Sequence, residues 1–264
     1  MTTKSFTSGA ARGTTATLFA VLALLLQTSI TPAADIQLLG ANGFRPILDE
    51  LGPVFEKSTG HKLAVTYATV GAVVKRVQDG ENADVVIAPR QGVDGLVKSG
   101  HATTANVTVI ARSHIGVAVR KGLTKPDISS PDALKRALLA AKTISYSDPA
   151  EGGASGVVIE RAFERLGILS ELKAKTVLAA NTSAMIALAT DGKADLFLNQ
   201  YQNLLAIPGA EVIGTMPGNL AEVTIFASAI LAGAKNADAA KALVAYLRGA
   251  EATKLIKAKG MEPG

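Results

Sequence analysis

Short apolar runs alternate with stretches of helical spacing along most of the chain. The run at 36–39 predicts a strand, and after the turn at 40–43 apolar residues recur every three or four positions as far as Phe55. Strands are expected again at 62–67 and 83–88, each with a helix behind it. Strands separated by helices predict βαβ units, and therefore an α/β fold with mainly parallel sheets flanked by helices.

A long apolar segment at 107–119 interrupts this rhythm, because it exceeds the length of the other strands. We expect it to cross from a first lobe into a second, and the run at 221–231 to bring the chain back. The crossing strands would then form a hinge. This organisation assigns residues 34–110 and 215–264 to lobe 1 and residues 111–214 to lobe 2.

The N-terminal segment has the three regions of a secretory signal peptide. Lys4 and Arg12 are its only charges, an apolar stretch covers 16–26, and small residues follow at 31–34. The apolar stretch is shorter than the roughly 20 residues that a membrane span needs. We expect a cleaved signal peptide over residues 1–33, and export of the rest of the chain.

Composition limits the kinds of protein that the predicted exported part can be. The sequence has no cysteine, which excludes disulfides and a lipid attached to a cysteine, and we expect a free soluble protein. The formal charge of +5 falls to +3 once the two basic leader residues are removed. The charges are scattered, tryptophan is absent and aromatic residues make up only 4% of the chain. Nucleic-acid binding is therefore not expected.

Small, hydroxyl-bearing or amide-bearing residues occupy the turns at 40–43, 68–71, 151–156 and 181–183, each ahead of a predicted helix. The first N–H groups of a helix lack internal partners and lie at the positive end of its dipole. If the four turns converge, they form a cage for an anion. The alternative for each turn is ordinary helix capping by the same residue types.

Further candidates differ in how strongly they point to a ligand. The turn at 151–156 contains three glycines and a serine, more than a cap requires. Arg90 follows a predicted strand, where a guanidinium can clamp a carboxylate, although a solvated surface arginine is an equal alternative. The segment 199–201 supplies either ligand donors or a polar loop. Residues 148–149 are expected to shape the glycine-rich turn.

Enzymatic interpretations find little support. His61, His101 and His114 lie in three separate places without metal-ligand spacing. The segment 153–157 is similar to a nucleophile elbow, but Val157 stands where that motif needs a glycine. The same loop lacks the Gly-Lys-Ser/Thr ending of a phosphate loop. We therefore expect no catalysis, no metal and no cofactor.

Several motifs together resemble the molybdate-binding proteins of bacterial ABC importers. They are Phe-Glu-Lys-Ser-Thr-Gly-His-Lys at 55–62, Thr-Val-Gly-Ala at 69–72, Asn-Ala-Asp-Val-Val-Ile-Ala at 82–88, Ser-Asp-Pro at 147–149 and Gly-Lys-Ala-Asp at 192–195. The resemblance runs in matching order from about residue 35 to the end. It implies a type 2 periplasmic binding protein, with two α/β lobes that close over a tetrahedral oxyanion.

The resemblance also implies a set of ligand-binding positions. The serine of the family's first loop falls at Asn42 or Gly43, and that of its second loop at Thr69. Two backbone amides of the family fall near Ser155 and Thr182. The family's tyrosine falls near Gln200, so that two hydroxyl donors are replaced by amides. Together with the candidates above, the expected ligand-binding residues are Asn42, Gly43, Thr69, Val70, Arg90, Ser155, Gly156, Thr182 and Gln200.

These observations predict a monomeric periplasmic solute-binding protein for an oxyanion of the molybdate class, which delivers its ligand to the membrane permease of an ABC importer. A small organic di- or tricarboxylate remains the alternative ligand. Two other classes stay open, namely the ligand-sensing effector domain of a regulator and an exported enzyme on the same scaffold. The export leader stands where such a regulator would carry its DNA-binding helices.

Overall fold

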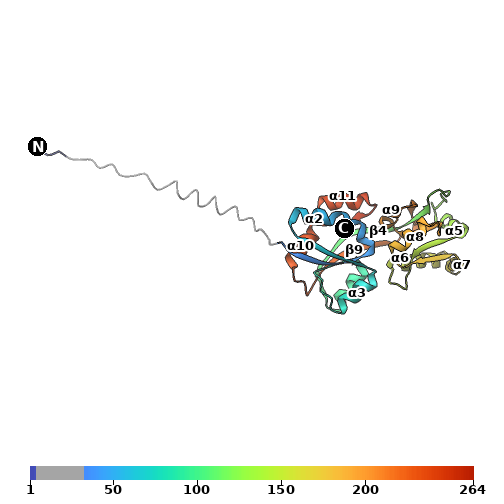
Figure 1. Ribbon diagram of the computed structural model, residues 1–264, viewed down its shortest axis with the longest axis horizontal. Helices are drawn as coiled ribbons and strands as arrows, with labels where there is room; N and C mark the ends of the chain where they lie inside the picture. Colours follow the sequence, from blue (N-terminus) through green and yellow to red (C-terminus); the bar gives the residue numbers. More distant parts are fainter. Residues whose placement is uncertain (4–32) are drawn as a thin grey trace. The chain divides into compact units, whose positions relative to one another are not determined.

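The computed structural model describes residues 1–3 and 33–264, so the predicted signal peptide lies almost wholly outside the described residues. Residues Ala33–Gly264 form one compact unit. Its strands follow the order β2-β1-β3-β9-β4-β7-β5-β6, with β8 and β10 also paired to β4. The long strand β4 (Ala102–Arg120) is central to this order, because it belongs to two sheets (Figure 1).

The first sheet is built around β1, which pairs in parallel with β2 and β3, while β9 pairs antiparallel with β3 and with the N-terminal part of β4. The strands of this sheet are β1 (Asp35–Ala41), β2 (Lys62–Ala68), β3 (Val85–Pro89), β9 (Val223–Leu231) and β10 (Glu262–Pro263). Its helices are η2 (Asn42–Phe44), α2 (Arg45–Thr59), α3 (Val70–Gln78), α4 (Arg90–Lys98), α10 (Ala237–Tyr246) and α11 (Ala250–Ala258).

The second sheet begins where β4 changes partners. From Ile115 onward β4 pairs antiparallel with β7 and β8, and β5 continues the sheet in parallel with β6 and β7. Its other strands are β5 (Ile144–Ser147), β6 (Thr176–Ala179), β7 (Leu196–Gln200) and β8 (Ala210–Thr215). The helices here are α5 (Pro131–Ala140), α6 (Ala154–Arg165), α7 (Leu169–Lys173), α8 (Thr182–Thr190), α9 (Tyr201–Leu205) and η3 (Gly218–Leu220).

Local sequence explains why these elements form. Helix α2 buries Ile47, Leu51 and Phe55 on one face, and it ends at Gly60, whose φ of 77° favours glycine. All five residues of β3 are buried, as expected for a strand covered on both faces. Separate apolar clusters form beside the two sheets, with Phe55 in one and Phe163 in another.

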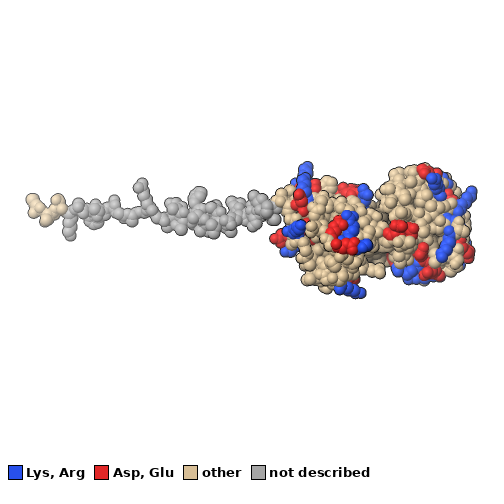
Figure 2. All heavy atoms as spheres, turned by 60° about the horizontal axis from the view of Figure 1, so that its bottom comes forward, with Lys and Arg blue, Asp and Glu red and all other residues tan. Residues whose placement is uncertain are grey.

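The predicted α/β class with helix-flanked sheets is confirmed, and the apolar segment at 107–119 lies within the strand shared by both sheets. The pattern did not predict β8 or β10, and the lobe boundaries stay a prediction. No helix of residues 1–3 and 33–264 has the length and apolarity of a membrane span. On the face shown in Figure 2, basic and acidic residues are interspersed over the folded unit.

Candidate functional site

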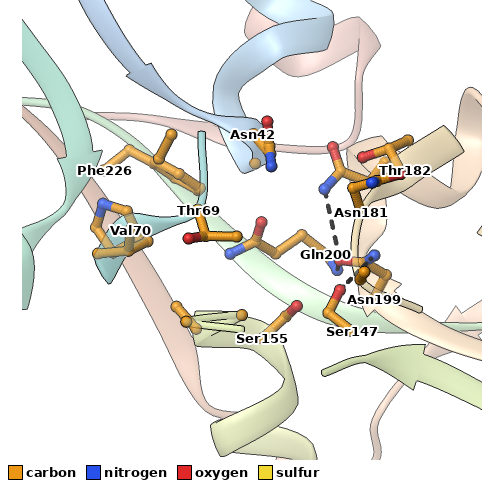
Figure 3. A pocket seen from close by; sticks show the side chains of 18 residues that line it. Asn42, Thr69, Val70, Ser147, Ser155, Asn181, Thr182, Asn199, Gln200 and Phe226 are labelled. Carbon is orange, nitrogen blue, oxygen red and sulfur yellow. Dashed lines mark hydrogen bonds between the residues drawn. The ribbon is translucent and has the colours of Figure 1, made fainter. Parts of the chain in front are cut away.

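A cavity of about 50 Å³ lies where several strands end and the following helices begin. This is the usual position of ligand sites in open α/β sheets. The walls come from both sheets (Figure 3). The lining residues are Ala41, Asn42, Gly43, Thr69, Val70, Pro89, Ser147, Gly152, Gly153, Ala154, Ser155, Ala180, Asn181, Thr182, Asn199, Gln200, Asn203 and Phe226.

None of these 18 lining residues has a titratable side chain. The cavity is instead surrounded by hydroxyls, carboxamides and the N-terminal ends of helices, which present backbone N–H groups. A preformed set of such donors attracts negative charge without a neutralising cation. The electrostatic character of the cavity therefore suits an anion.

The turn ahead of α3 combines capping with free donors. Thr69 is the N-cap, and its Oγ1 accepts a hydrogen bond from the backbone N of Ala72 over 3.4 Å. The N–H of Val73 donates to the carbonyl of Thr69. The N–H groups of Val70 and Gly71 consequently have no partner within the helix, and the hydroxyl proton of Thr69 remains available.

The glycine-rich turn is closed by Asp148, as the sequence predicts. The N–H of Gly153 donates to the carbonyl of Asp148, and the N–H of Ala150 donates to its carboxylate over 2.9 Å. Gly152 has a φ of 76°, and a Cβ there would lie 3.0 Å from Thr69 Oγ1 and 3.3 Å from the backbone N of Gly71. Glycine at 152 thus lets two turns, which follow strands of different sheets, approach each other closely.

Helix α8 begins in the same manner. Asn181 is its N-cap and accepts from the backbone N of Ala184 over 2.9 Å, while Met185 N–H donates to the carbonyl of Asn181. The amide groups of Thr182 and Ser183 lack partners within the helix. Capping therefore leaves donors available to a ligand in this turn, because the cap satisfies only part of the exposed N–H groups.

The corner between β7 and α9 supplies buried carboxamides. Asn199 Oδ1 accepts from the backbone N of Gln200 over 2.7 Å, and its Nδ2 donates to Ser147 Oγ over 3.2 Å, which fixes its orientation. The side chain of Gln200 extends across the cavity toward Thr69 (Figure 3). It is only 4% exposed, and its carboxamide makes no hydrogen bond to the described residues. Gln200 is thus a buried polar group aimed into the cavity.

Most of the predicted ligand-binding residues come together in this cavity, namely Asn42, Gly43, Thr69, Val70, Ser155, Thr182 and Gln200. Arg90 and Gly156 do not line it. Arg90 Nε lies 2.6 Å from Asp94 Oδ1 on the next turn of α4, so its guanidinium is engaged there. Gly156 is buried, and a Cβ would collide with the carbonyl of Ser147, which gives this glycine a packing role.

Other lining residues escaped the sequence analysis. Asn203 is 4% exposed, and its Oδ1 has no hydrogen-bond partner among the described residues. Phe226 reaches the cavity from β9. Tyr201 does not line the cavity, since its ring packs against Gly260. The polarity of the corner at 199–203 hinted at Asn203, but nothing local distinguishes Phe226 from other core aromatics.

The described residues contain no cluster of three or more histidine, aspartate or glutamate side chains that could hold a metal ion. The arrangement is a mixed α/β fold of the periplasmic binding protein type, with an uncharged cavity between two sheets. Residues 36–262 match the family of bacterial extracellular solute-binding proteins, and the chain belongs to this family.

Relatives of the chain are named for different activities. The chain is 33% identical to an aconitate isomerase from Pseudomonas sp over 88% of this chain and 89% of that protein. It is 28% identical to the molybdate-binding protein ModA of Azotobacter vinelandii over 86% and 90% of the two chains. The solved structure of the periplasmic molybdate-binding protein of Azotobacter vinelandii superposes with a TM-score of 0.71 at 21% identity, and covers 87% of this chain and 99% of that one.

Proposed function

We propose that the chain is the periplasmic solute-binding component of an ABC importer, and that its cavity captures a small anion. The observation that carries this proposal is the lining, in which 18 residues contribute backbone, hydroxyl and carboxamide groups and no titratable side chain. Proton-transfer catalysis needs a group whose pKa lies near the working pH. A cavity without such a group suits capture and release of a ligand more than its conversion.

The size of the cavity favours an oxyanion of the molybdate class. A buried water needs about 10–15 Å³ of such space, so a volume of about 50 Å³ accommodates a group the size of a few waters. A tetrahedral oxyanion is of this size. A tricarboxylate has more than twice as many non-hydrogen atoms, and would need the side chain of Gln200 to swing aside.

The donors available are sufficient for tight binding. A hydrogen bond to a charged group contributes about 1.5–3 kcal/mol net, so five or six of them contribute roughly 8–18 kcal/mol before the cost of association is subtracted, compared with roughly 8 kcal/mol for micromolar and 12 kcal/mol for nanomolar affinity. The cavity-lining N–H groups of Val70, Ala154, Ser155 and Thr182, which have no partner within their helices, provide five donors together with the Thr69 hydroxyl. Arg90 is not required in this account.

A tricarboxylate of the aconitate type is the second candidate ligand, and it is favoured by the 33% identity with an aconitate isomerase over 88% of the chain. Under that alternative the chain either captures the tricarboxylate or isomerises it. Isomerisation moves a proton between carbon atoms, so it would require a titratable group beyond the residues that line the cavity here.

A thermal-shift screen of the leader-free protein tests the proposal. The panel contains molybdate, tungstate, sulfate, phosphate, citrate and trans-aconitate. A ligand at about 100 times its dissociation constant adds about 2.7 kcal/mol to the free energy of unfolding. We expect at least one tetrahedral oxyanion to raise the melting temperature. A shift with carboxylates alone would replace the oxyanion by the second candidate, and the absence of any shift would refute the receptor proposal.

A further inference from the structure

Gln202 is fully buried behind the cavity and is not among the residues that line it. Its Nε2 donates to the carbonyl of Gly43 over 2.7 Å. Its Oε1 accepts from Ser113 Oγ over 2.6 Å, and Ser113 is also fully buried. Both ends of this carboxamide are therefore satisfied, in a chain of two short hydrogen bonds.

The three residues of this chain belong to three different parts of the fold. Ser113 lies on β4 immediately before the point where that strand leaves β9 and begins to pair with β7. Gln202 lies on α9, which follows β7. Gly43 lies on η2, the first of the turns around the cavity. The hydrogen bonds thus connect the strand shared by both sheets with a turn at the ligand site.

The orientation of the Gln202 carboxamide is determined by its neighbours. The backbone carbonyl of Gly43 can only accept, so Nε2 must face it. Oε1 then faces Ser113, whose hydroxyl donates. Removal of either end leaves a buried polar group unsatisfied, which costs far more than an exposed hydrogen bond contributes.

The same corner holds Gly43 in a second way. The side chain of Gln200 lies against the α-carbon of Gly43, while Gln202 holds its carbonyl. We propose that Gln202 is a positioning residue, which keeps the Asn42–Gly43 turn at the distance from Gln200 that anion binding requires. This inference rests on the proposed function, because it concerns the geometry of the same cavity.

The variant Gln202→Glu tests this role with almost no change in shape. A protonated glutamic acid keeps one donor and one acceptor, whereas an ionised carboxylate has only acceptors and faces the carbonyl of Gly43. Burial raises the pKa of a carboxyl group above its ordinary value of about 4.3, so the variant should be protonated at low pH and ionise only as the pH rises. Ionisation of a buried carboxyl also destabilises the fold wherever it lies, so the role in positioning is judged from the ligand affinity of the variant that remains folded.

Other titratable groups near this position are His114, which follows Ser113 on β4, and Glu262 on β10, whose Oε1 lies 3.6 Å from His114 Nε2. Among the described residues, no other titratable side chain forms a hydrogen bond or ion pair with Gln202, Ser113 or Gly43. Both side chains are present in the native protein as well. The ratio of native to variant affinity at each pH therefore removes their contribution, together with any protonation of the ligand.

The affinities of native protein and Gln202→Glu are measured by calorimetry at pH 5.5 and pH 8, with molybdate and with trans-aconitate as probes. We expect the variant to bind within about threefold of the native protein at pH 5.5, and at least tenfold more weakly at pH 8, since a lost buried hydrogen bond costs about 1–3 kcal/mol. Gln78→Glu, on the exposed end of α3, is the matched control and should match the native protein at both pH values. A variant affinity close to native at pH 8 would overturn the proposal.

Two further measurements test the proposal if Gln202→Glu folds poorly or if the ligand is not identified. Ser113→Ala removes only the hydroxyl donor, and it should weaken binding about threefold. If the substitution leaves the affinity unchanged, that result counts against the proposal. Because the sequence has no cysteine, spin labels can be placed at Lys57 and Lys173 through introduced cysteines. Without any anion, the label distances in Gln202→Glu should broaden between pH 5.5 and pH 8, but stay constant in the native background. Unchanged distances would contradict positioning by Gln202 even if the proposed anion function fails independently.

Discussion

The carboxamide oxygen of Gln200 occupies the space that a Cβ atom at Gly43 would need. Gly43 lies on η2, beside the first sheet, and Gln200 is the last residue of β7 in the second sheet. They meet only because the chain folds around the shared strand β4. The Cβ would also lie 2.9 Å from Phe226 Cζ. The Gln200 side chain can therefore occupy this position only while residue 43 has no Cβ atom.

Gly43→Ala should weaken anion binding at least tenfold, because the new methyl group displaces Gln200 from its place in the cavity. The double variant Gly43→Ala/Gln200→Ala restores room for the methyl group. It should therefore bind more tightly than the sum of the two single effects predicts, as a double-mutant cycle by calorimetry will show. Strict additivity would mean that the two residues act independently.

Arg90→Ala should leave oxyanion affinity unchanged within about threefold, because the guanidinium pairs with Asp94 and does not line the cavity. The half-exposed ion pair contributes less than about 1 kcal/mol to stability. Calorimetric titration and thermal unfolding measure both effects. A tenfold loss of affinity for a carboxylate would instead restore the clamp that the sequence suggested.

Thr69 combines an N-cap with a proposed ligand donor, and measurements of stability and of affinity report on the two separately. Thr69→Val should lose about 1 kcal/mol of stability with the N-cap, and about tenfold in anion affinity with the hydroxyl donor. Thr69→Ser retains both groups and should stay close to native in both measurements. Equal affinities for Val and Ser variants would show that the hydroxyl makes no contact with the ligand.

The carboxyl group of Glu222 should make the free energy of unfolding depend on pH. Hydrogen bonds from Arg161, and the charges of Arg161 and Arg165, hold the pKa of its carboxyl below the ordinary value of 4.5. Because the folded pKa is lowered, the stabilisation is present above the unfolded pKa and is lost as the pH falls through the folded pKa. Glu222→Gln should therefore reduce stability by up to about 1 kcal/mol at pH 7, and less below about pH 4. Denaturant unfolding at both pH values measures this effect. A difference in the free energy of unfolding between native protein and variant that stays constant with pH would contradict the assignment.

The sequence predicted those features that local patterns control. The face formed by Ile47, Leu51 and Phe55 has helical spacing and is buried. The turns that line the cavity could be predicted because the residues that cap a helix also surround its free N–H groups, as at Thr69 and Asn181. Turns that follow parallel strands lie at the carboxyl edge of their own sheet, so the turns of each sheet were expected to lie close together.

Contacts between distant segments could not be predicted in this way. Arg90 occupies the expected place in the sequence, yet an aspartate one helical turn away engages it. Gln202 and Asn203 belong to a short polar helix whose partners lie on other elements, so no periodic pattern marks them. Phe226 is apolar like its neighbours on β9, and only the packing of that strand brings it to the cavity.

If the uncharged cavity binds one small oxyanion, calorimetric titration of the leader-free protein with molybdate should detect it. We expect one anion per chain with at least micromolar affinity, equal affinity in Arg90→Ala, and a large loss in Gly43→Ala. The account would be contradicted if molybdate, tungstate, sulfate and phosphate all gave no binding heat while trans-aconitate bound or was converted to its isomer.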